Sequence, residues 1–441
     1  MKIGLYGGMA NNMYVFAKAL SASGVDICFI RDRSDHYPFS QPVWEDVEFT
    51  LPYADVPRAV LWSWDEWGAL EEKLGWRQPE WMFDPLVADK LPLKKVSLAG
   101  NNLLDRYWLK RYLAAPHRAA TFNKMCECDA LLVCGTEGSI LARLTGKPYI
   151  IWPHGGDMMI AAGLLRQPNE KIRQRVAYNI VSRQLDLAFQ NSICVGNHEP
   201  SGITSDYGGA ESYIRQLNVV FMPIPIPLRV RPELPRRRKS MGALLASRGL
   251  TLPENALVGF IPSRLDYECK GQDKLLQAVV RLQHRARAVG LRLVFSGWGI
   301  DLELAREFAR KTAIDDIVMF LDVALSKPLL FEFYLAADFV VDQFNLGMYG
   351  TSALEAMASG SPLMIWLNQS YERSWGAPPV INAHTVEEIE TVLGRLVDGE
   401  FDLERDGAEL QNWLESVHNP DRVVKHLLEC YACPESVEKG W

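Results

Sequence analysis

Two basic residues in the second half of the chain lie where an expected strand gives way to an expected helix. Arg264 and Lys270 stand within residues 262–273, after an apolar run and before a run with helical spacing. Two cations beside a helix N-terminus suit a diphosphate, because the positive end of the helix dipole adds to their charge. The stretch therefore predicts a local site for a small diphosphate.

Glycines and carboxylates lie at comparable places further along the chain. Gly297 and Gly299 follow the next apolar run, Asp342 lies within a third, and Glu355 falls in a helix expected over residues 351–359. Glycine lets the backbone approach a phosphate or a sugar closely, although a single Gly-x-Gly usually marks only a turn. Glu355 either faces a ligand or is a favourable charge near a helix N-terminus.

Taken in order, these stretches resemble the C-terminal half of GT-B glycosyltransferases, specifically the retaining family 4 type (glycosyl transferases group 1). The pattern spans residues 262–362 and runs Arg-Leu, Lys-Gly, Gly-x-Gly, Ala-Asp and then Gly followed by Leu-Glu-Ala-Met-Ala-x-Gly-x-Pro. The resemblance implies a hexosyltransferase of enzyme class EC 2.4. It also implies that Arg264 and Lys270 bind the donor's diphosphate and neutralise the departing nucleotide, and that Glu355 hydrogen-bonds the ribose hydroxyls.

The N-terminal half matches the same family in two loops. Residues 7–8 look like the glycine loop that faces the donor phosphates, and residues 152–157 look like the family's His-Gly-x-Asp loop. By itself, a histidine between proline and glycine is more often a turn residue than a catalytic one. The resemblance instead implies that His154 contacts the donor sugar near the reacting centre, and we place Asp157 on the acceptor side.

The site residues implied in this way form two overlapping sets. The catalytic set comprises His154, Arg264 and Lys270, and the donor-binding set comprises Gly7, Gly8, Arg264, Lys270, Gly297, Gly299, Asp342, Gly350, Thr351 and Glu355.

The chain departs from the family pattern in two places. The family usually carries a second glutamate eight positions before the one that matches Glu355, where it meets the donor sugar, but this chain has Gly347 there. Either Asp342, Gln343 or Asn345 supplies that contact, or the sugar is handled differently. The spacing between the two basic residues is also one residue longer than the commonest one.

A retaining transfer of this kind leaves little for a protein base to do, because the leaving diphosphate can itself accept the acceptor's proton. Catalysis then rests on positioning and on stabilising charge at the leaving group. Two cations and helix dipoles can do the neutralising that Mg²⁺ performs in other transferases. We therefore expect no metal, and no cofactor beyond the nucleotide-sugar co-substrate.

Six of the thirteen tryptophans crowd into one early segment. Indole faces stack on sugar rings and also sit well at membrane interfaces, whereas the alternative is a segment that simply packs over a sheet edge. If the segment is functional, Trp62 and Trp64 belong to the acceptor side. The six residues are Trp44, Trp62, Trp64, Trp67, Trp76 and Trp81.

Short apolar runs alternate with helix-length amphipathic stretches through both halves of the chain. This alternation predicts parallel strands joined by crossover helices. We expect an α/β architecture of the GT-B type, with two Rossmann-like, doubly wound parallel-sheet domains that face a cleft. The expected strands cover residues 2–7, 26–31, 130–134, 149–152, 192–196 and 218–223, and then 256–263, 291–297, 317–321, 339–344 and 361–367.

A proline-rich, basic stretch separates the two series of strands. Proline fixes φ and removes an amide donor, so residues 223–240 should form an extended linker, which is more often solvated than bound to nucleic acid or anionic lipid. The expected organisation is an N-terminal acceptor domain over residues 1–222, that linker, a C-terminal nucleotide-sugar donor domain over residues 241–415, and a C-terminal helix within residues 416–441 that could pack back on the first domain.

Composition excludes several classes of protein. The 441 residues are 48% hydrophobic and 23% charged, which does not fit a disordered or fibrous chain. The net charge of -7 gives no overall attraction to a phosphate backbone, so we expect no nucleic-acid partner. With no leader or bilayer-length apolar run and eight scattered cysteines, we expect a cytoplasmic protein, either free or in peripheral contact with the inner face of the membrane.

Together these features favour a glycosyltransferase of polysaccharide biosynthesis. It would move a sugar from a nucleotide-diphosphate sugar to a glycan, a lipid-linked or a small-molecule acceptor. Two alternatives stay open. One is a nucleotide-sugar epimerase or hydrolase of the same fold, and the other is a non-catalytic nucleotide-sugar-binding protein, which Gly347 suggests.

Overall fold

The computed structural model of the chain describes residues 1–59, 61–86, 92–165, 172–197, 209–368 and 377–433. The chain forms two compact units, and each unit is assembled from separate stretches of sequence. The first unit comprises Met1–Pro42, Arg77–Pro225 and Pro420–Trp441, and the second comprises Val43–Trp76 and Ile226–Asn419.

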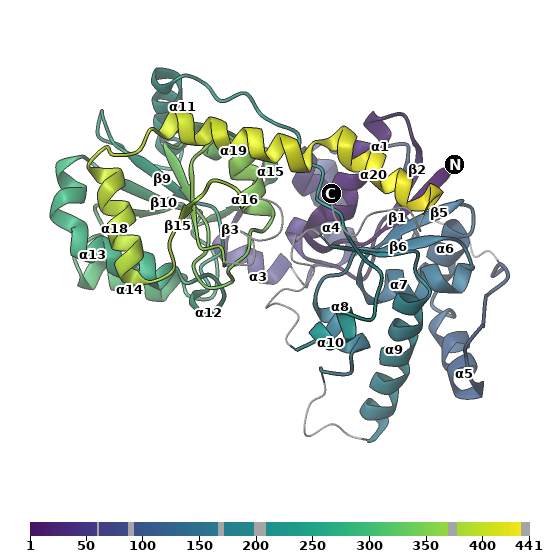
Figure 1. Cartoon of the computed structure of the whole chain (residues 1–441). Helices are drawn as coiled ribbons and strands as arrows, with labels where there is room; N and C mark the ends of the chain where they lie inside the picture. Colours follow the sequence, from purple (N-terminus) through teal and green to yellow (C-terminus); the bar gives the residue numbers. More distant parts are fainter. Residues whose placement is uncertain (60, 87–91, 166–171, 198–208, 369–376, 434–441) are drawn as a thin grey trace. The chain divides into compact units, whose positions relative to one another are not determined.

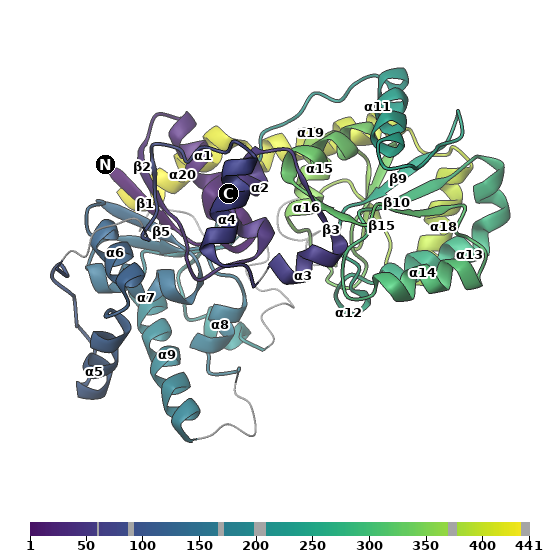
Figure 2. The same cartoon turned by 180° about the vertical axis from the view of Figure 1, so that it is seen from behind.

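A seven-stranded parallel sheet forms the centre of the first unit. In spatial order its strands are β4 (Met82–Phe83), β2 (Asp26–Ile30), β1 (Lys2–Tyr6), β5 (Ala130–Val133), β6 (Tyr149–Ile151), β7 (Val195–Asn197) and β8 (Val219–Phe221). The strands are short apolar runs because helices cover both faces. Figures 1 and 2 show α1 (Asn12–Ala22) and α20 (Pro420–Ala432) on one face, and α7 (Gly135–Thr145) and α9 (Ile172–Gln190) on the other.

The second unit is built around a six-stranded parallel sheet. Its spatial order is β11 (Val318–Phe320), β10 (Arg292–Phe295), β9 (Val258–Ile261), β13 (Phe339–Val341), β14 (Leu363–Ile365) and β15 (Ile381–Asn382). In Figures 1 and 2, α13 (Gln272–Ala288), α14 (Leu302–Lys311) and α18 (Val386–Val397) lie on one face, opposite α15 (Lys327–Ala336), α16 (Thr351–Ala358) and α19 (Leu403–His418). The prediction of two doubly wound parallel sheets is confirmed. None of the helices in the described ranges is both long and apolar enough to cross a bilayer.

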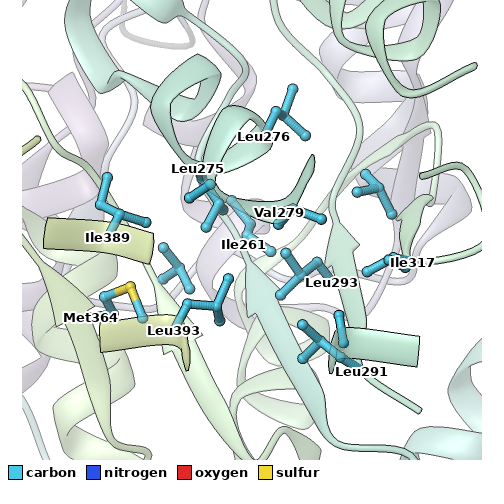
Figure 3. Close-up of a cluster of buried hydrophobic side chains, with 14 of the residues drawn as sticks. Ile261, Leu275, Leu276, Val279, Leu291, Leu293, Ile317, Met364, Ile389 and Leu393 are labelled. Carbon is cyan, nitrogen blue, oxygen red and sulfur yellow. The ribbon is translucent and has the colours of Figure 1, made fainter. Parts of the chain in front are cut away.

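A hydrophobic core joins this sheet to α13 and α18. Ile261 and Leu293 project from β9 and β10 toward Leu275 and Val279 of α13 and Leu393 of α18, and all five side chains are fully buried (Figure 3). The α13 residues recur at helical spacing, so one face of that helix is apolar. This packing fixes the ends of β9 and β10, and therefore the loops that follow them.

A segment from the early part of the chain belongs to the second unit. We call Val43–Trp76 the strap. Its strand β3 (Thr50–Pro52) pairs antiparallel with β12 (Val323–Leu325). At the end of this ladder the amide of Phe49 donates to Ser326 Oγ at 2.9 Å, and the amide of Ser326 donates to the carbonyl oxygen of Phe49 at 3.0 Å. The expected N-terminal domain of residues 1–222 therefore lacks this segment, because the pairing joins residues that are distant in sequence.

The basic stretch between the two series of strands is extended only in its first part. Helix α11 (Leu234–Ala246) begins inside it, with a proline in the first turn, where the missing amide donor does no harm. Arg237 is 2% exposed and donates to Glu404 at 3.0 Å. Arg231 donates to two backbone carbonyl oxygens at 2.7 Å, and burial lowers the pKa of Arg231 to about 10. The predicted extended conformation of residues 223–240 is therefore wrong from Leu234 onward, and Arg237 is not solvated.

Candidate functional site

The second sheet reverses its strand order between β9 and β13. The chain runs outward from β9 to β10 and β11, then returns to place β13 on the other side of β9. In open parallel sheets, ligands bind at such a reversal, outside the carboxyl ends of the strands. Ser263 and Arg264 follow β9 at this edge, and Asp342 follows β13. The corresponding reversal in the first sheet lies between β1 and β5.

The loop after β9 carries both predicted cations on one braced turn. Arg264 pairs with Asp266 at 3.1 Å while its side chain stays 46% exposed. Asp266 also caps α12 (Tyr267–Lys270) by accepting a backbone amide at 3.1 Å. Although burial works against it, these hydrogen bonds and the charge of Arg264 hold the pKa of Asp266 below its ordinary value. Half-buried Lys270 ends the turn, and its carbonyl oxygen accepts the amide of Phe344 at 2.8 Å.

Gly297 and Gly299 are required by the close packing of three loops. A Cβ at Gly297 would lie 2.6 Å from the amide nitrogen of Asp322, and a Cβ at Gly299 would lie 2.3 Å from the carbonyl oxygen of Leu265. The amide of Leu265 also donates to this loop at 2.7 Å. These two glycines thus support the turn that carries the cations, whether or not they touch a ligand.

Gly350 and Thr351 lie at the start of α16, and the surroundings of Gly350 differ from those of Gly297 and Gly299. Gly350 is the N-cap residue, with φ −104°, and a Cβ at this position would have no atom within 4 Å. Thr351 is half-buried. Neither the backbone nor the packing demands glycine here, so open space is left beside the first amides of the helix.

Glu355 is buried and has protein partners for both carboxylate oxygens. Lys327 donates to one oxygen, and the hydroxyl of Tyr334 donates to the other at 3.3 Å. Glu45 of the strap lies 3.8 Å from the ammonium of Lys327. Burial raises the pKa of Glu355 and the ammonium opposes this; burial alone would lower the pKa of Lys327, but the charges of Glu355 and Glu45 raise it.

The contact of Glu355 with a ribose stays a prediction, but the structure shows that Lys327 and Tyr334 already bind its carboxylate. Sequence reasoning missed Lys327 and Tyr334, because nothing in the local pattern shows that α15 lies against α16. The only local signal is a Lys-Pro pair at the start of α15, which marks a helix start and no charge partner.

The backbone conformation at position 347 explains why this chain has glycine where the family has glutamate. Gly347 has φ 68°, and a Cβ there would lie 2.9 Å from the ring of Trp366. A glutamate does not fit this position without strain, because residues other than glycine rarely adopt such a φ. Nearby, Asp342 is 1% exposed and accepts a hydrogen bond from the hydroxyl of Ser263.

In the first unit, the predicted glycine loop packs tightly on the loop after β5. A Cβ at Gly7 would lie 1.9 Å from Cys134 Sγ, and a Cβ at Gly8 would lie 3.0 Å from Cβ of Asp35. Packing therefore accounts for Gly7, and the contact of both residues with donor phosphates stays a prediction.

The loop after β6 holds His154 in a very tight turn. The amide of Gly156 donates to the carbonyl oxygen of His154 at 2.6 Å across Gly155, whose φ of 67° and ψ of −60° define a rare γ-turn. Asp157 braces this turn by accepting the amides of His154 at 3.0 Å and Met158 at 2.9 Å. Burial raises the pKa of Asp157 to about 6, although these amides oppose the rise. An acceptor contact by Asp157 stays a prediction.

The two tryptophans expected on the acceptor side lie in the strap. Trp64 is the first residue of α4 (Trp64–Lys73), and the rings of Trp62 and Trp67 lie 4.8 Å apart. The strap belongs to the second unit, so Trp62 and Trp64 lie outside the first unit, and their contact with an acceptor stays a prediction.

A thiol and an imidazole lie side by side on α20. Cys430 Sγ and His426 Nε2 are 3.9 Å apart, and His426 Nε2 lies 3.0 Å from the carbonyl oxygen of Phe221.

Among the residues that the structure describes, no three His, Cys, Asp or Glu side chains gather closely enough to hold a metal ion. A metal-independent reaction stays a prediction.

No protein-family model matches the chain, and no curated protein matches its sequence. Solved structures are nevertheless similar over almost its full length. Sucrose-phosphate synthase from Thermosynechococcus elongatus matches with a TM-score of 0.57 at 13% identity, covering 98% of both chains. HepE from Anabaena, solved with UDP and glucose, matches with 0.57 at 13% identity, covering 98% of this chain and 99% of its own. The catalytic domain of starch synthase IV from Arabidopsis thaliana, bound to ADP and acarbose, matches with 0.57 at 14% identity and the same coverages. These likenesses confirm the expected GT-B fold.

Proposed function

We propose that this chain is a glycosyltransferase that moves a sugar from a nucleotide-diphosphate sugar to a glycan, a lipid-linked or a small-molecule acceptor. The observation that carries the proposal is the braced turn after β9, where Arg264 and Lys270 stand at the strand-order reversal of a parallel sheet. The GT-B fold supports it, since proteins of similar fold have been solved with UDP, glucose and ADP.

In the proposed reaction, the bond between the sugar's anomeric carbon and the diphosphate oxygen breaks. A bond to an acceptor hydroxyl oxygen forms, and that hydroxyl's proton passes to the leaving phosphate, with retention at the anomeric carbon. Arg264 and Lys270 stabilise the charge that grows on the diphosphate, because charge-assisted hydrogen bonds are about twice as strong as neutral ones. His154 contacts the donor sugar, and Gly350 leaves room for the donor beside the start of α16.

A thermal-shift screen across nucleoside diphosphates and their sugar conjugates tests the proposal. A ligand that binds the folded chain raises its melting temperature by mass action. We expect one nucleotide class to raise the melting temperature, and its sugar conjugate to be transferred or slowly hydrolysed. The same activity should persist in EDTA, because the two side-chain cations do the neutralising. Loss of turnover in EDTA would contradict the metal-independent mechanism.

The first prediction concerns the two cations. Arg264→Ala or Lys270→Ala should weaken nucleoside-diphosphate binding about ten- to hundred-fold, because each change removes a charge-assisted contact. Isothermal titration measures the affinity, and the unliganded melting temperature should stay close to that of the original chain. Lys311→Ala is the matched control, since Lys311 is exposed on α14 and pairs only with Glu307 among the described residues. Equal affinities in all four proteins would overturn the assignment.

A non-catalytic nucleotide-sugar-binding protein is the second candidate, and Gly347 is the observation that favours it. The backbone there excludes the carboxylate that the family uses for the donor sugar. Saturable binding of a nucleotide sugar without transfer or hydrolysis, under conditions in which a known glycosyltransferase turns the same donor over, would support this second function.

A further inference from the structure

A carboxylate oxygen at the strand-order reversal of the second sheet has no hydrogen-bond partner within the described part of the chain. Asp342 is 1% exposed, its Oδ1 accepts the hydroxyl of Ser263, and its Oδ2 is buried without a hydrogen bond to any described residue. Buried polar atoms almost always form hydrogen bonds, and a buried charged oxygen without one destabilises the fold. The oxygen therefore calls for a donor that the described residues do not provide.

The neighbouring donors are committed elsewhere. Tyr334 is one candidate donor, because the charge of Asp342 contributes, after burial and the charge of Glu355, to raising the pKa of Tyr334. Its hydroxyl therefore keeps its proton, but donates it to Glu355 at 3.3 Å. Ser263 has one hydroxyl proton, which already goes to Oδ1 of Asp342.

Gln343 does not replace the missing family carboxylate. Its side-chain amide donates to the carbonyl oxygens of Met348 at 2.5 Å and Trp366 at 3.0 Å. Its oxygen accepts the amides of Asn345 at 3.0 Å and Leu346 at 2.7 Å. All four hydrogen-bonding positions of the side chain are thus used to hold the loop after β13.

Asn345 is committed as well. Its amide nitrogen donates to the carbonyl oxygens of Tyr267 at 2.9 Å and Glu268 at 3.0 Å. Both of its donor protons therefore tie the loop after β13 to α12, the turn that carries Lys270. Of the three residues that could stand in for a glutamate at Gly347, only Asp342 has a buried side-chain oxygen without a hydrogen bond to any described residue.

The position of Asp342 indicates what kind of group would reach that oxygen. Ser263, which binds the other oxygen, is the direct neighbour of Arg264 in the cationic turn. A carboxylate accepts hydrogen bonds and repels anions, so the missing group is a donor that lies beside a diphosphate but is not part of it. In a nucleotide sugar, hydroxyl-bearing rings flank the diphosphate on both sides, namely the ribose and the transferred sugar.

We propose that Asp342 Oδ2 accepts a hydrogen bond from a hydroxyl of the nucleotide-sugar donor, in place of the carboxylate that Gly347 does not supply. The inference rests on the proposed function and names the residue that selects the donor by its hydroxyls. Donor binding then supplies the hydrogen bond that Oδ2 of Asp342 lacks among the described residues, at a pair, Ser263 and Asp342, that the strand reversal brings together.

The test compares Asp342→Asn with the original chain by isothermal titration, using UDP, UDP-glucose, ADP and ADP-glucose. The variant keeps the shape of the side chain and its bond with Ser263 but loses the negative charge. We expect the affinity for the sugar conjugate to fall about ten- to hundred-fold. If UDP or ADP alone binds as before, the hydroxyl belongs to the sugar; if both ligands weaken equally, it belongs to the ribose.

Asp338→Asn is the matched control. Asp338 is also a buried aspartate at an end of β13, but at the opposite end, where it accepts the amide of Val258 at 2.8 Å. This variant should lose stability without losing donor affinity. Unchanged affinities in Asp342→Asn would overturn the inference and leave the proposed function standing, whereas failure of the original chain to bind any nucleotide sugar would overturn both.

A second variant covers the case in which Asp342→Asn does not fold. Ser263→Ala removes a small neutral group and releases the carboxylate from its partner. In the original chain, one UDP-glucose analogue that lacks a single hydroxyl should bind at least about ten-fold more weakly than UDP-glucose, and Ser263→Ala should reduce that difference. A difference that Ser263→Ala leaves unchanged would overturn the role of Asp342.

Discussion

At the scale of single residues, the glycines of the second unit serve different needs. Gly297 and Gly299 are where they are because other backbone atoms occupy the space of a Cβ, whereas the space at Gly350 is empty. A glycine that the fold does not require is a better candidate for ligand contact than one that it does. A substitution at Gly350 therefore tests ligand binding with less effect on stability than a substitution at Gly297 or Gly299.

Gly350→Ser should preserve the fold and lower the affinity for a nucleoside diphosphate. Serine is a better N-cap than glycine by a few tenths of a kcal/mol, so the melting temperature should stay level or rise. A side chain beside the first amides of α16 should nevertheless reduce nucleoside-diphosphate affinity about ten-fold or more, since it blocks close approach. Gly242→Ser on α11, where the space is also open, is the control and should leave the affinity unchanged. Retained affinity in Gly350→Ser would argue against a ligand at this helix start.

Asp157 should make the first unit more stable at acidic pH than at neutral pH. Burial raises the pKa of Asp157 to about 6 from a value near 3.8 in the unfolded chain. The folded state therefore holds its proton more tightly, and this contribution is present below about pH 4 and lost as the pH rises through 6. The difference corresponds to about 3 kcal/mol.

Asp157→Asn removes this titration. Melting temperatures of the original chain and the variant, measured between pH 4 and 7.5, should diverge, with the variant gaining relative to the original chain as the pH rises. Parallel curves would show that Asp157 has an ordinary pKa.

Residue by residue, the cations could be predicted and their surroundings could not. Arg264 and Lys270 belong to a continuous stretch in which charge and helix start are both visible in the sequence. Lys327 meets Glu355, and Ser263 meets Asp342, only because separate elements pack together. No local pattern carries that information.

At the scale of elements, the strap changes which residues make up the second unit, compared with the expectation from sequence. It provides β3 to a two-stranded ladder, Glu45 to the Lys327 pair, and Tyr53 to the glycine loop. Tyr53 packs its ring on the core of the second unit, and its hydroxyl donates to the carbonyl oxygen of Gly299 at 3.2 Å. A segment read from sequence as part of the other domain thus supports the loops of the candidate donor site.

Tyr53→Phe should reveal this support. The ring stays in place and one hydrogen bond is lost, which is worth about 1 kcal/mol. We expect donor affinity to fall about two- to ten-fold, because the loop around Gly299 supports the cationic turn. Tyr37→Phe, at a tyrosine that is 49% exposed in the first unit, is the control. Identical donor affinities in the two variants and the original chain would mean that the hydrogen bond of Tyr53 does not contribute to donor binding.

The strands were predictable for a physical reason, and the strap was not. Residues 130–134 and 339–344 were expected as strands, and β5 (Ala130–Val133) and β13 (Phe339–Val341) occupy them, because strands buried on both faces are continuous apolar runs. β3 is three residues long, and only its middle residue is buried. Its partner lies some 270 residues away, so its place depends on tertiary pairing alone.

At the scale of the whole molecule, the chain passes between its two units four times. The last passage carries α20 back to the first unit, where it packs beside α1. Val423 and Leu427 of α20 are fully buried, and the hydroxyl of Tyr431 donates to the carbonyl oxygen of Leu131 in β5 at 2.6 Å. The end of the described chain is thus part of the first sheet's covering.

Leu427→Asp should destabilise the first unit selectively. The change removes a buried side chain and places an unpaired charge in its stead, which together cost at least about 3 kcal/mol. Hydrogen exchange should accelerate in β1 and β5 while β9 and β13 keep their protection. Lys425→Asp is the control, because Lys425 is 79% exposed on the same helix. Equal acceleration in both sheets, or none in either, would contradict the assignment of α20 to the first unit.

The position of α20 in the chain sets the order in which the protein is completed during synthesis. Ile226–Asn419 must all leave the ribosome before α20 does. At about 5 to 20 residues per second, that interval lasts roughly 10 to 40 s. Throughout it, the nascent first unit exposes the apolar face that Val423 and Leu427 later cover. Translation speed through the second unit therefore sets how long that face is open to chaperones and to aggregation.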